Sequence, residues 1–310
     1  MVAFEVIAQG TVPATHVEDA PAVHAVVLEE PVHCVHRPEG TLPPMAGPDL
    51  GDVAVTVDAD AAVATLTLTR PSRRNALSVA MTQRFHDALD RVEADPGVRA
   101  VVVVGEPPAF CAGADFGDFD ETSDRGGFLP MFQDLLERMA HFRIPFVAAV
   151  AGPALGAGCQ ILAACDLRIV ATDARIGIPA ARIGLQLDIV NLNRLVCEFG
   201  PTAARRLLIT GEPVDGTEAA ALGFVHEVLP AGEVLGRATH WAGLVASRAP
   251  LSVLGHKAAI QSVVDGWWLT ASDPAHARHR DASETVYASA DLREGLAAFA
   301  EKRAPRFEGR

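Results

Sequence analysis

The chain has 310 residues, and 49% of them are apolar, enough for one large domain or two smaller ones, so disorder throughout is excluded. Its 26 lysines and arginines face 39 carboxylates, and the net charge of −13 excludes the broad basic surface that attracts nucleic acids or anionic lipids. Ten of the carboxylates lie in residues 1–60, so residues 61–310 carry less of the negative charge. An anionic ligand could therefore still bind to residues 61–310 where arginines are grouped locally.

The sequence predicts a cytoplasmic protein without a membrane span. Five cysteines form no CxxC pair, and no basic, apolar leader opens the chain. An uncharged run over 144–165 is long enough to span a bilayer, but its prolines and glycines favour a strand, a turn and a buried helix. No metal site is predicted, because strand alternation would keep His33, Cys34 and His36 from all lying on one face.

In chain order, an acidic, proline-containing extension (1–51) precedes a β-hairpin predicted over 53–57 and 63–69. Ser78 can cap a helix that continues to about Glu93. Buried strands are expected at 100–104, 146–150 and 167–171, with a helix around 129–139 between the first two. The later helices are expected over 188–199, 202–208, 217–222, 234–246, 251–264 and 282–300. Strands alternating with helices, followed by helices alone, indicate an α/β fold with a helical C-terminal part.

Two glycine-rich junctions between a strand and a helix are the first candidates for chemistry. They lie at 112–115 and 152–160. Such turns leave backbone N–H groups unpaired, and two converging donors can stabilise the oxyanion of an enolate. The alternative is that these glycines only let strand and helix pack closely. A dinucleotide fingerprint is disfavoured, because its third glycine would stand where Ile161 is.

Several short motifs occur in a characteristic order along the chain. They are Arg70-Pro71, Asn75-Ala76-Leu77, residues 109–115 (AFCAGAD), 149–152 (AVAG), Gly158-Cys159, 165–168 (CDLR), 223–225 (GFV), 293–295 (REG), Ala298-Phe299 and 301–303 (EKR). In this order they resemble the enoyl-CoA hydratase/isomerase (crotonase) superfamily from about Val53 to Phe307. The resemblance implies an α/β spiral of ββα units over 52–250 and a helical trimerisation region over 251–310. It also implies a homotrimer or hexamer, and an acyl-CoA thioester as substrate with no other cofactor.

The resemblance also implies site residues. It places the oxyanion-hole N–H groups at Ala112 and Ala157, and at Ala157 alanine replaces the more usual glycine but keeps the donor. Coenzyme A is expected to contact the backbone of Ala114 and Asp115. Further candidates for its phosphates and adenine are Arg70, Arg73 or Arg74, Phe299 and Lys302. For each arginine, the alternative is an ordinary solvated side chain.

The departures from the family pattern concern the acid and base. Hydratases of the family carry two glutamates where this chain has Gln160 and Ala180. An amide can orient water but cannot accept a proton at neutral pH, and a methyl group can do neither. Asp188 stands where dienoyl-CoA isomerases carry an aspartate, and in an apolar pocket it could shuttle a proton. The alternative is that Asp188 caps the helix beginning at Ile189.

These residues predict an acyl-CoA enzyme that stabilises a thioester enolate and favours isomerisation, or another enolate reaction through Asp188, over standard hydration. The alternative is a non-catalytic acyl-CoA binding protein that kept the pocket and lost its acids. Cys159 could act as a nucleophile near a helix start, but a small buried residue is the favoured interpretation.

Overall fold

The computed structural model describes residues 51–115, 127–266, 281 and 284–310. The acidic extension predicted over 1–51 therefore lies outside the described residues, apart from Gly51. Among the helices in these ranges, none is both long enough and apolar enough to cross a membrane.

Five strands of the main sheet correspond to predicted strands, and the last one, at 227–229, was not predicted. It contains β1 (Val53–Asp58), β2 (Val63–Leu68), β3 (Ala100–Gly105), β4 (Phe146–Val150), β6 (Leu167–Ala171) and β8 (Glu227–Leu229), adjacent in that order. Only β1 runs antiparallel to its neighbour, as expected for a hairpin, and the other pairs are parallel. All of β4 and most of β3 are buried, which explains why these strands are continuous apolar runs rather than alternating ones.

A second, two-stranded sheet brings the glycine-rich turns together. Strand β5 (Ala154–Leu155) pairs in parallel with β7 (Ile176–Gly177), and an isolated bridge joins Cys111 to Ala154 on the other side. Two-residue strands are too short to show a period, so they could not be predicted from the sequence. They matter because they fix the loops of the candidate site relative to each other.

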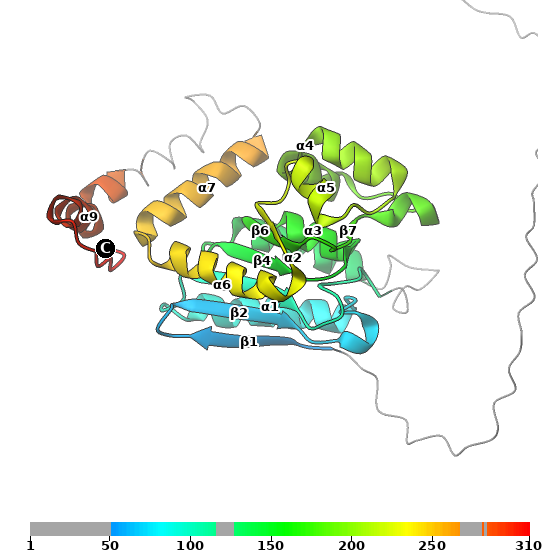
Figure 1. Ribbon diagram of the computed structural model, residues 1–310, viewed down its shortest axis with the longest axis horizontal. Coiled ribbons are helices and arrows are strands. Elements are labelled where there is room, and N and C mark those ends of the chain that lie inside the picture. Colours follow the sequence, from blue (N-terminus) through cyan, green and yellow to red (C-terminus); the bar gives the residue numbers. More distant parts are fainter. Residues whose placement is uncertain (1–50, 116–126, 267–280, 282–283) are drawn as a thin grey trace, which may run out of the picture. The chain divides into compact units, whose positions relative to one another are not determined.

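Helices pack against the main sheet, and the first of them begins at a polar cap. Helix α1 (Val79–Ala94) starts at Ser78, whose side chain accepts a hydrogen bond from the Met81 N–H at 3.1 Å, as predicted. Helix α6 (Ala231–Ala246) packs across β2, β3, β4 and β6 (Figure 1). Its fully buried Ala238 and Ala242 carry only methyl groups, which allow a close approach to the strands.

The remaining helices include one break that the sequence predicts and one that it does not. Helix α4 (Ile189–Thr210) is interrupted by the non-helical backbone of Gly200 before Pro201, so it consists of two segments, as expected. The helix predicted over 282–300 stops at Ser289, which caps α9 (Ala290–Glu301) through its hydroxyl. The other helical elements are η1 (Pro71–Arg73), α2 (Phe128–His141), α3 (Ala157–Ala163), η4 (Pro179–Ile183), α5 (Gly216–Ala221) and α7 (Pro250–Gly266).

The start of α5 provides a test of this packing. A Cβ on Gly216 would lie 2.1 Å from the Ala171 carbonyl oxygen, so we expect Gly216→Ala to lower the free energy of unfolding by about 1–3 kcal/mol. Gly236 is an exposed glycine of α6 with nothing within 4 Å of such a Cβ, and Gly236→Ala should stabilise by about 0.5–1 kcal/mol. Urea denaturation measures both, and equal effects would contradict the packing described.

Candidate active site

The loop after β3 is held by the side chain of Asn75. Its amide nitrogen donates to the carbonyl oxygens of Glu106 and Ala109, at 2.8 and 2.7 Å. Its amide oxygen accepts the Arg70 N–H at 2.9 Å. Asn75 is fully buried and has a positive φ of 58°, a conformation that asparagine tolerates better than most residues. One side chain thus connects the turn after β2 to the loop after β3.

Arg70 and Asp115, both predicted to contact coenzyme A, form an ion pair with each other. The guanidinium is buried and lies 2.7 Å from the Asp115 carboxylate and 3.0 Å from the Ala76 carbonyl oxygen. This geometry fastens the end of the loop to the turn at Ala76. The pair therefore holds the shape of the loop, and the Arg70 side chain is turned inward rather than toward solvent.

The loop over 111–115 runs between two segments and bonds to both. On one side, the Leu77 N–H donates to Gly113 and the Asp115 N–H donates to Leu77, both at 2.8 Å. On the other side, the Leu155 N–H donates to the Cys111 carbonyl at 2.9 Å, in parallel register with β5. Beyond this contact, the two segments continue to Ala114 and to Ala157, which begins α3.

The hydrogen bonds decide which backbone donors are available. The Ala112 N–H donates to the Arg74 carbonyl at 3.0 Å, so it is occupied, which corrects the predicted donor pair. Leu77 and Ala114 form a parallel bridge, in which the hydrogen bonds with Leu77 are made by the residues on either side of Ala114. The Ala114 N–H therefore points to the opposite side. Within the described part of the chain, neither this N–H nor that of Ala157 makes a hydrogen bond.

Close backbone contacts hold these two donors near each other. A Cβ on Gly113 would lie 3.9 Å from the Ala157 nitrogen, and one on Gly158 would lie 2.3 Å from the Cys111 carbonyl oxygen. Gly156 has φ of 54° and donates its own N–H to the Gly177 carbonyl at 2.9 Å. The Ala157 N–H is the first that follows, at the start of α3. The sequence identified this glycine-rich pattern but not which of its amides are occupied.

Gln160 lies one turn of α3 after Ala157, on the same side of the helix. The residue is half-buried, and its side-chain oxygen is buried with no hydrogen-bond partner. It is the single buried side-chain polar atom in this state among the residues that the structure describes. An unsatisfied buried carbonyl costs about 1–3 kcal/mol, so a ligand or water that donates to it is favoured.

The two other positions of the predicted acid–base chemistry differ in their surroundings. Ala180 is buried in η4 and presents only a methyl group. Asp188 is exposed rather than set in an apolar pocket, and it caps α4 by accepting from the N–H groups of Val190 and Asn191, at 3.1 and 3.0 Å. Its second oxygen accepts from the Asn191 amide at 2.7 Å. Asp188 therefore caps α4, as the alternative interpretation of this residue predicts, and each of its carboxylate oxygens accepts at least one hydrogen bond.

The remaining predicted coenzyme A residues are not brought together by any contact among the described residues. Arg73 and Arg74 are exposed beside the loop, and their side chains make no hydrogen bond or ion pair there. Lys302 is exposed at the end of α9. The side chain of Phe299 lies outside what the structure describes.

Burial disfavours thiolate chemistry at this site. It raises the pKa of Cys111 and Cys159 to about 12, so both thiols are protonated at neutral pH. Burial raises the pKa of the Cys165 thiol in the same way. The His33-Cys34-Val35-His36 motif lies outside the described residues. Among the residues that the structure describes, no three histidine, cysteine or acidic side chains are grouped so that they could hold a metal ion.

Comparison with known proteins identifies the family of this fold and site. The sequence model of the enoyl-CoA hydratase/isomerase family matches residues 58–310. The chain belongs to the enoyl-CoA hydratase/isomerase family. A putative enoyl-CoA hydratase of Thermus thermophilus is 38% identical over 256 residues, covering 79% of this chain and 97% of that protein. The 2,3-dehydroadipyl-CoA hydratase of Escherichia coli is 31% identical over 245 residues, covering 79% and 94%.

Solved structures of the family have the same fold. A probable enoyl-CoA hydratase/isomerase from Mycobacterium abscessus superposes with a TM-score of 0.75 at 32% identity, covering 84% of this chain and all of that one. The crotonase fold and the enzyme class predicted from the motifs are thereby confirmed. The trimer or hexamer that the resemblance implies stays a prediction.

The role of Asn75 can be tested by its removal. Asn75→Ala leaves two buried carbonyl groups without their donor, so we expect a loss of about 2–3 kcal/mol in the free energy of unfolding. Asn193→Ala, on the exposed side of α4, should change it by less than about 0.5 kcal/mol. Chemical denaturation of both variants makes the comparison, and similar losses would mean that Asn75 does not organise the loop.

Proposed function

We propose that this enoyl-CoA hydratase/isomerase family member binds an acyl-CoA thioester and holds the thioester oxygen between the N–H groups of Ala114 and Ala157. The observation that carries the proposal is that these two amides, in adjoining segments, make no hydrogen bond among the residues that the structure describes. The glycine contacts that bring the segments together support the same pairing.

Two preorganised donors favour enolate chemistry. When a proton leaves the carbon next to the thioester, negative charge moves onto the carbonyl oxygen, where the N–H groups stabilise it. The donors are fixed by backbone pairing, so they need no rearrangement as the charge develops. The chemistry that follows depends on which group removes the proton and where a proton is returned.

Three side chains favour isomerisation over standard hydration. Gln160 can position a water or a substrate hydroxyl at its unpartnered oxygen, but it cannot take a proton, and Ala180 offers no polar group. We assign proton transfer to Asp188, whose second oxygen accepts only one hydrogen bond and keeps a lone pair. In this scheme the carboxylate removes a proton from one carbon and returns it to another, which moves the double bond without net loss or gain of atoms.

Arg73 and Arg74 are assigned to the phosphates of coenzyme A. Both are exposed, and the Arg74 carbonyl accepts the Ala112 N–H, which attaches this turn directly to the loop of the site. Guanidinium groups bind phosphate oxygens through paired hydrogen bonds. The inward ion pair with Asp115 gives Arg70 a supporting role instead.

The oxyanion assignment can be tested by removing one donor. Proline fits the first position of a helix and lacks an N–H, so Ala157→Pro should lower turnover of an active acyl-CoA ester by about 100-fold or more. Ala157→Gly keeps the N–H and should remain within a few-fold of the wild type. Circular dichroism checks that both variants fold, and full activity of a folded Ala157→Pro enzyme would refute the assignment.

The proton-transfer assignment is tested at Asp188. Asparagine caps helices about as well as aspartate, so Asp188→Asn should preserve stability to within about 1 kcal/mol. It should nevertheless lower conversion of 3-enoyl- or dienoyl-CoA and deuterium uptake from D2O by about 100-fold or more. Unchanged uptake would remove Asp188 from the reaction. Tight binding of these esters by the wild type with no exchange and no product would favour the non-catalytic binding protein.

A further inference from the structure

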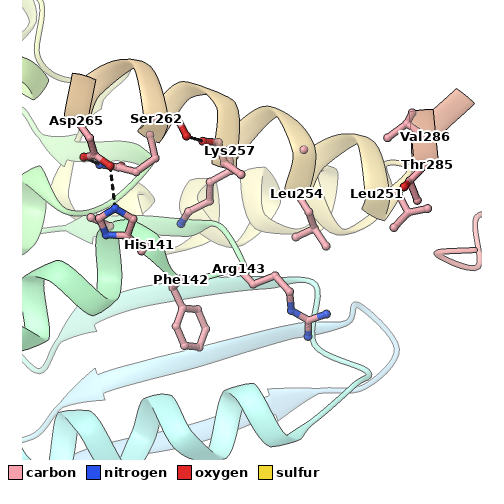
Figure 2. Close-up of a pocket in the computed structure, with 14 residues that line it drawn as sticks. His141, Phe142, Arg143, Leu251, Leu254, Lys257, Ser262, Asp265, Thr285 and Val286 are labelled. Carbon is pink, nitrogen blue, oxygen red and sulfur yellow. Dashed lines mark hydrogen bonds and ion pairs between the residues drawn. The ribbon is translucent and has the colours of Figure 1, made fainter. Parts of the chain in front are cut away.

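His141 ends α2 and faces the C-terminal turn of α7. Figure 2 shows its ring beside Asp265, with the side chains of α7 arranged along one face of that helix. Between the two helices lies a cavity of about 620 Å³, lined by apolar residues such as Leu251 and Leu254 as well as by His141 and Asp265. This cavity and this histidine belong to no part of the site described above.

Both nitrogens of the His141 ring face oxygen acceptors. Nδ1 lies 3.0 Å from the carbonyl oxygen of Glu137, and Nε2 lies 2.9 Å from the Asp265 carboxylate. Neutral imidazole carries one N–H, whereas imidazolium carries two. With Asp265 ionised, only the cation can make both hydrogen bonds at once.

The charged groups around the ring favour the cation. From α2, the Glu137 carboxylate lies 3.3 Å from Nδ1, and from α7, Asp265 contacts Nε2. From α4, the buried Arg194 bonds the other oxygen of Glu137 at 2.8 Å. Lys257 and Arg143 line the same cavity, but Lys257 is turned to Asp166 at 2.7 Å.

Helix α7 has a second attachment that does not depend on histidine. The Lys257 ammonium bonds Asp166 and the Ile144 carbonyl, at 2.7 and 3.2 Å, and lies 5.1 Å from the ring centroid of Phe146. The middle of α7 is therefore held by a contact that involves no imidazole, whereas the last turn of the helix contacts His141.

We propose that His141 is a pH-responsive clamp that fastens the last turns of α7 to α2 when the imidazole is protonated and releases them when it is neutral. Release removes one of the two hydrogen bonds and the attraction between opposite charges. Because both helices line the cavity, release also opens its wall at Asp265. This inference is independent of the reaction proposed above.

The balance of effects on His141 agrees with this geometry. Burial lowers the pKa of the imidazole, but the hydrogen bonds to Asp265 and Glu137 and their negative charges outweigh it and raise the pKa above 6.5. A raised pKa means that the stabilisation is complete below pH 6.5 and is lost as the pH rises through the pKa of the folded state.

The clamp also connects to the first turn of α4. Arg194, which holds Glu137, donates to the Asn191 amide oxygen at 3.1 Å, and Asn191 donates to Asp188 at 2.7 Å. A continuous set of hydrogen bonds therefore joins the cap of α4 to α2 and α7. Loosening α7 leaves Arg194 paired with Glu137, so the cap of α4 is expected to persist.

Hydrogen exchange of the full-length protein tests the clamp. Protection of the amides in 258–266, corrected for the intrinsic effect of pH, should fall by about threefold between pH 6 and pH 8.5 in the wild type, as expected for an exposed ion pair. His141→Gln cannot titrate and should lose this pH dependence. His256→Gln removes an exposed histidine of the same helix and should behave like the wild type. Peptides from α6 provide the reference within each sample.

A titration of His141 by NMR keeps the proposal testable if a variant is unstable. The wild-type imidazole should titrate above 6.5, and Asp265→Asn should move its pKa downward. The proposal is overturned if wild-type His141 titrates at or below 6.5. It is equally overturned if His141→Gln retains the pH-dependent loss of protection in 258–266.

Discussion

The arrangement of the candidate active site depends on the hydrogen bonds of one buried side chain, that of Asn75. Loops that carry catalytic backbone groups have no regular ladder to hold them, and each unpaired buried carbonyl destabilises the fold. Asn75 satisfies two carbonyl groups after β3 and one N–H after β2, so two loops distant in sequence become a single rigid unit. The Arg70–Asp115 ion pair then fixes the far end of the same loop. The two opposite charges thus hold the loop in position, and pairing with Asp115 offsets the cost of removing the Arg70 guanidinium from water.

The sequence predicted the regular part of this fold well, because burial and capping act locally. The Ser78 cap, the apolar run of β4 and the break before Pro201 each depend on a few neighbouring residues, and all are present in the structure. The two-residue strands β5 and β7 were missed because their pairing is determined by contacts outside their own sequence.

Some features of the candidate site could be predicted from the sequence and others could not. The glycine-rich junctions directed attention to turns that the structure brings together, whereas no motif indicated that the Ala112 N–H donates to the Arg74 carbonyl, 38 positions earlier in the chain. Likewise, the solvent exposure of Asp188 depends on how η4 and α4 pack against the rest of the chain. A local sequence pattern does not predict this packing. Which backbone donor is available is a property of three-dimensional pairing, and a motif alone does not contain it.

The close contact between Gly158 and the Cys111 carbonyl divides the site into a part that resists substitution and a part that tolerates it. Any side chain at Gly158 would separate the two segments that present the amides, so the half of the site proposed to stabilise the anion is fixed by backbone sterics. Gln160, Ala180 and Asp188 project from elements whose own hydrogen bonds are formed by the main chain or by caps that several polar residues can supply. In the proposed reaction, the chemistry can therefore be redesigned by exchanging these three side chains, while the backbone scaffold assigned to the thioester oxygen is inherited unchanged.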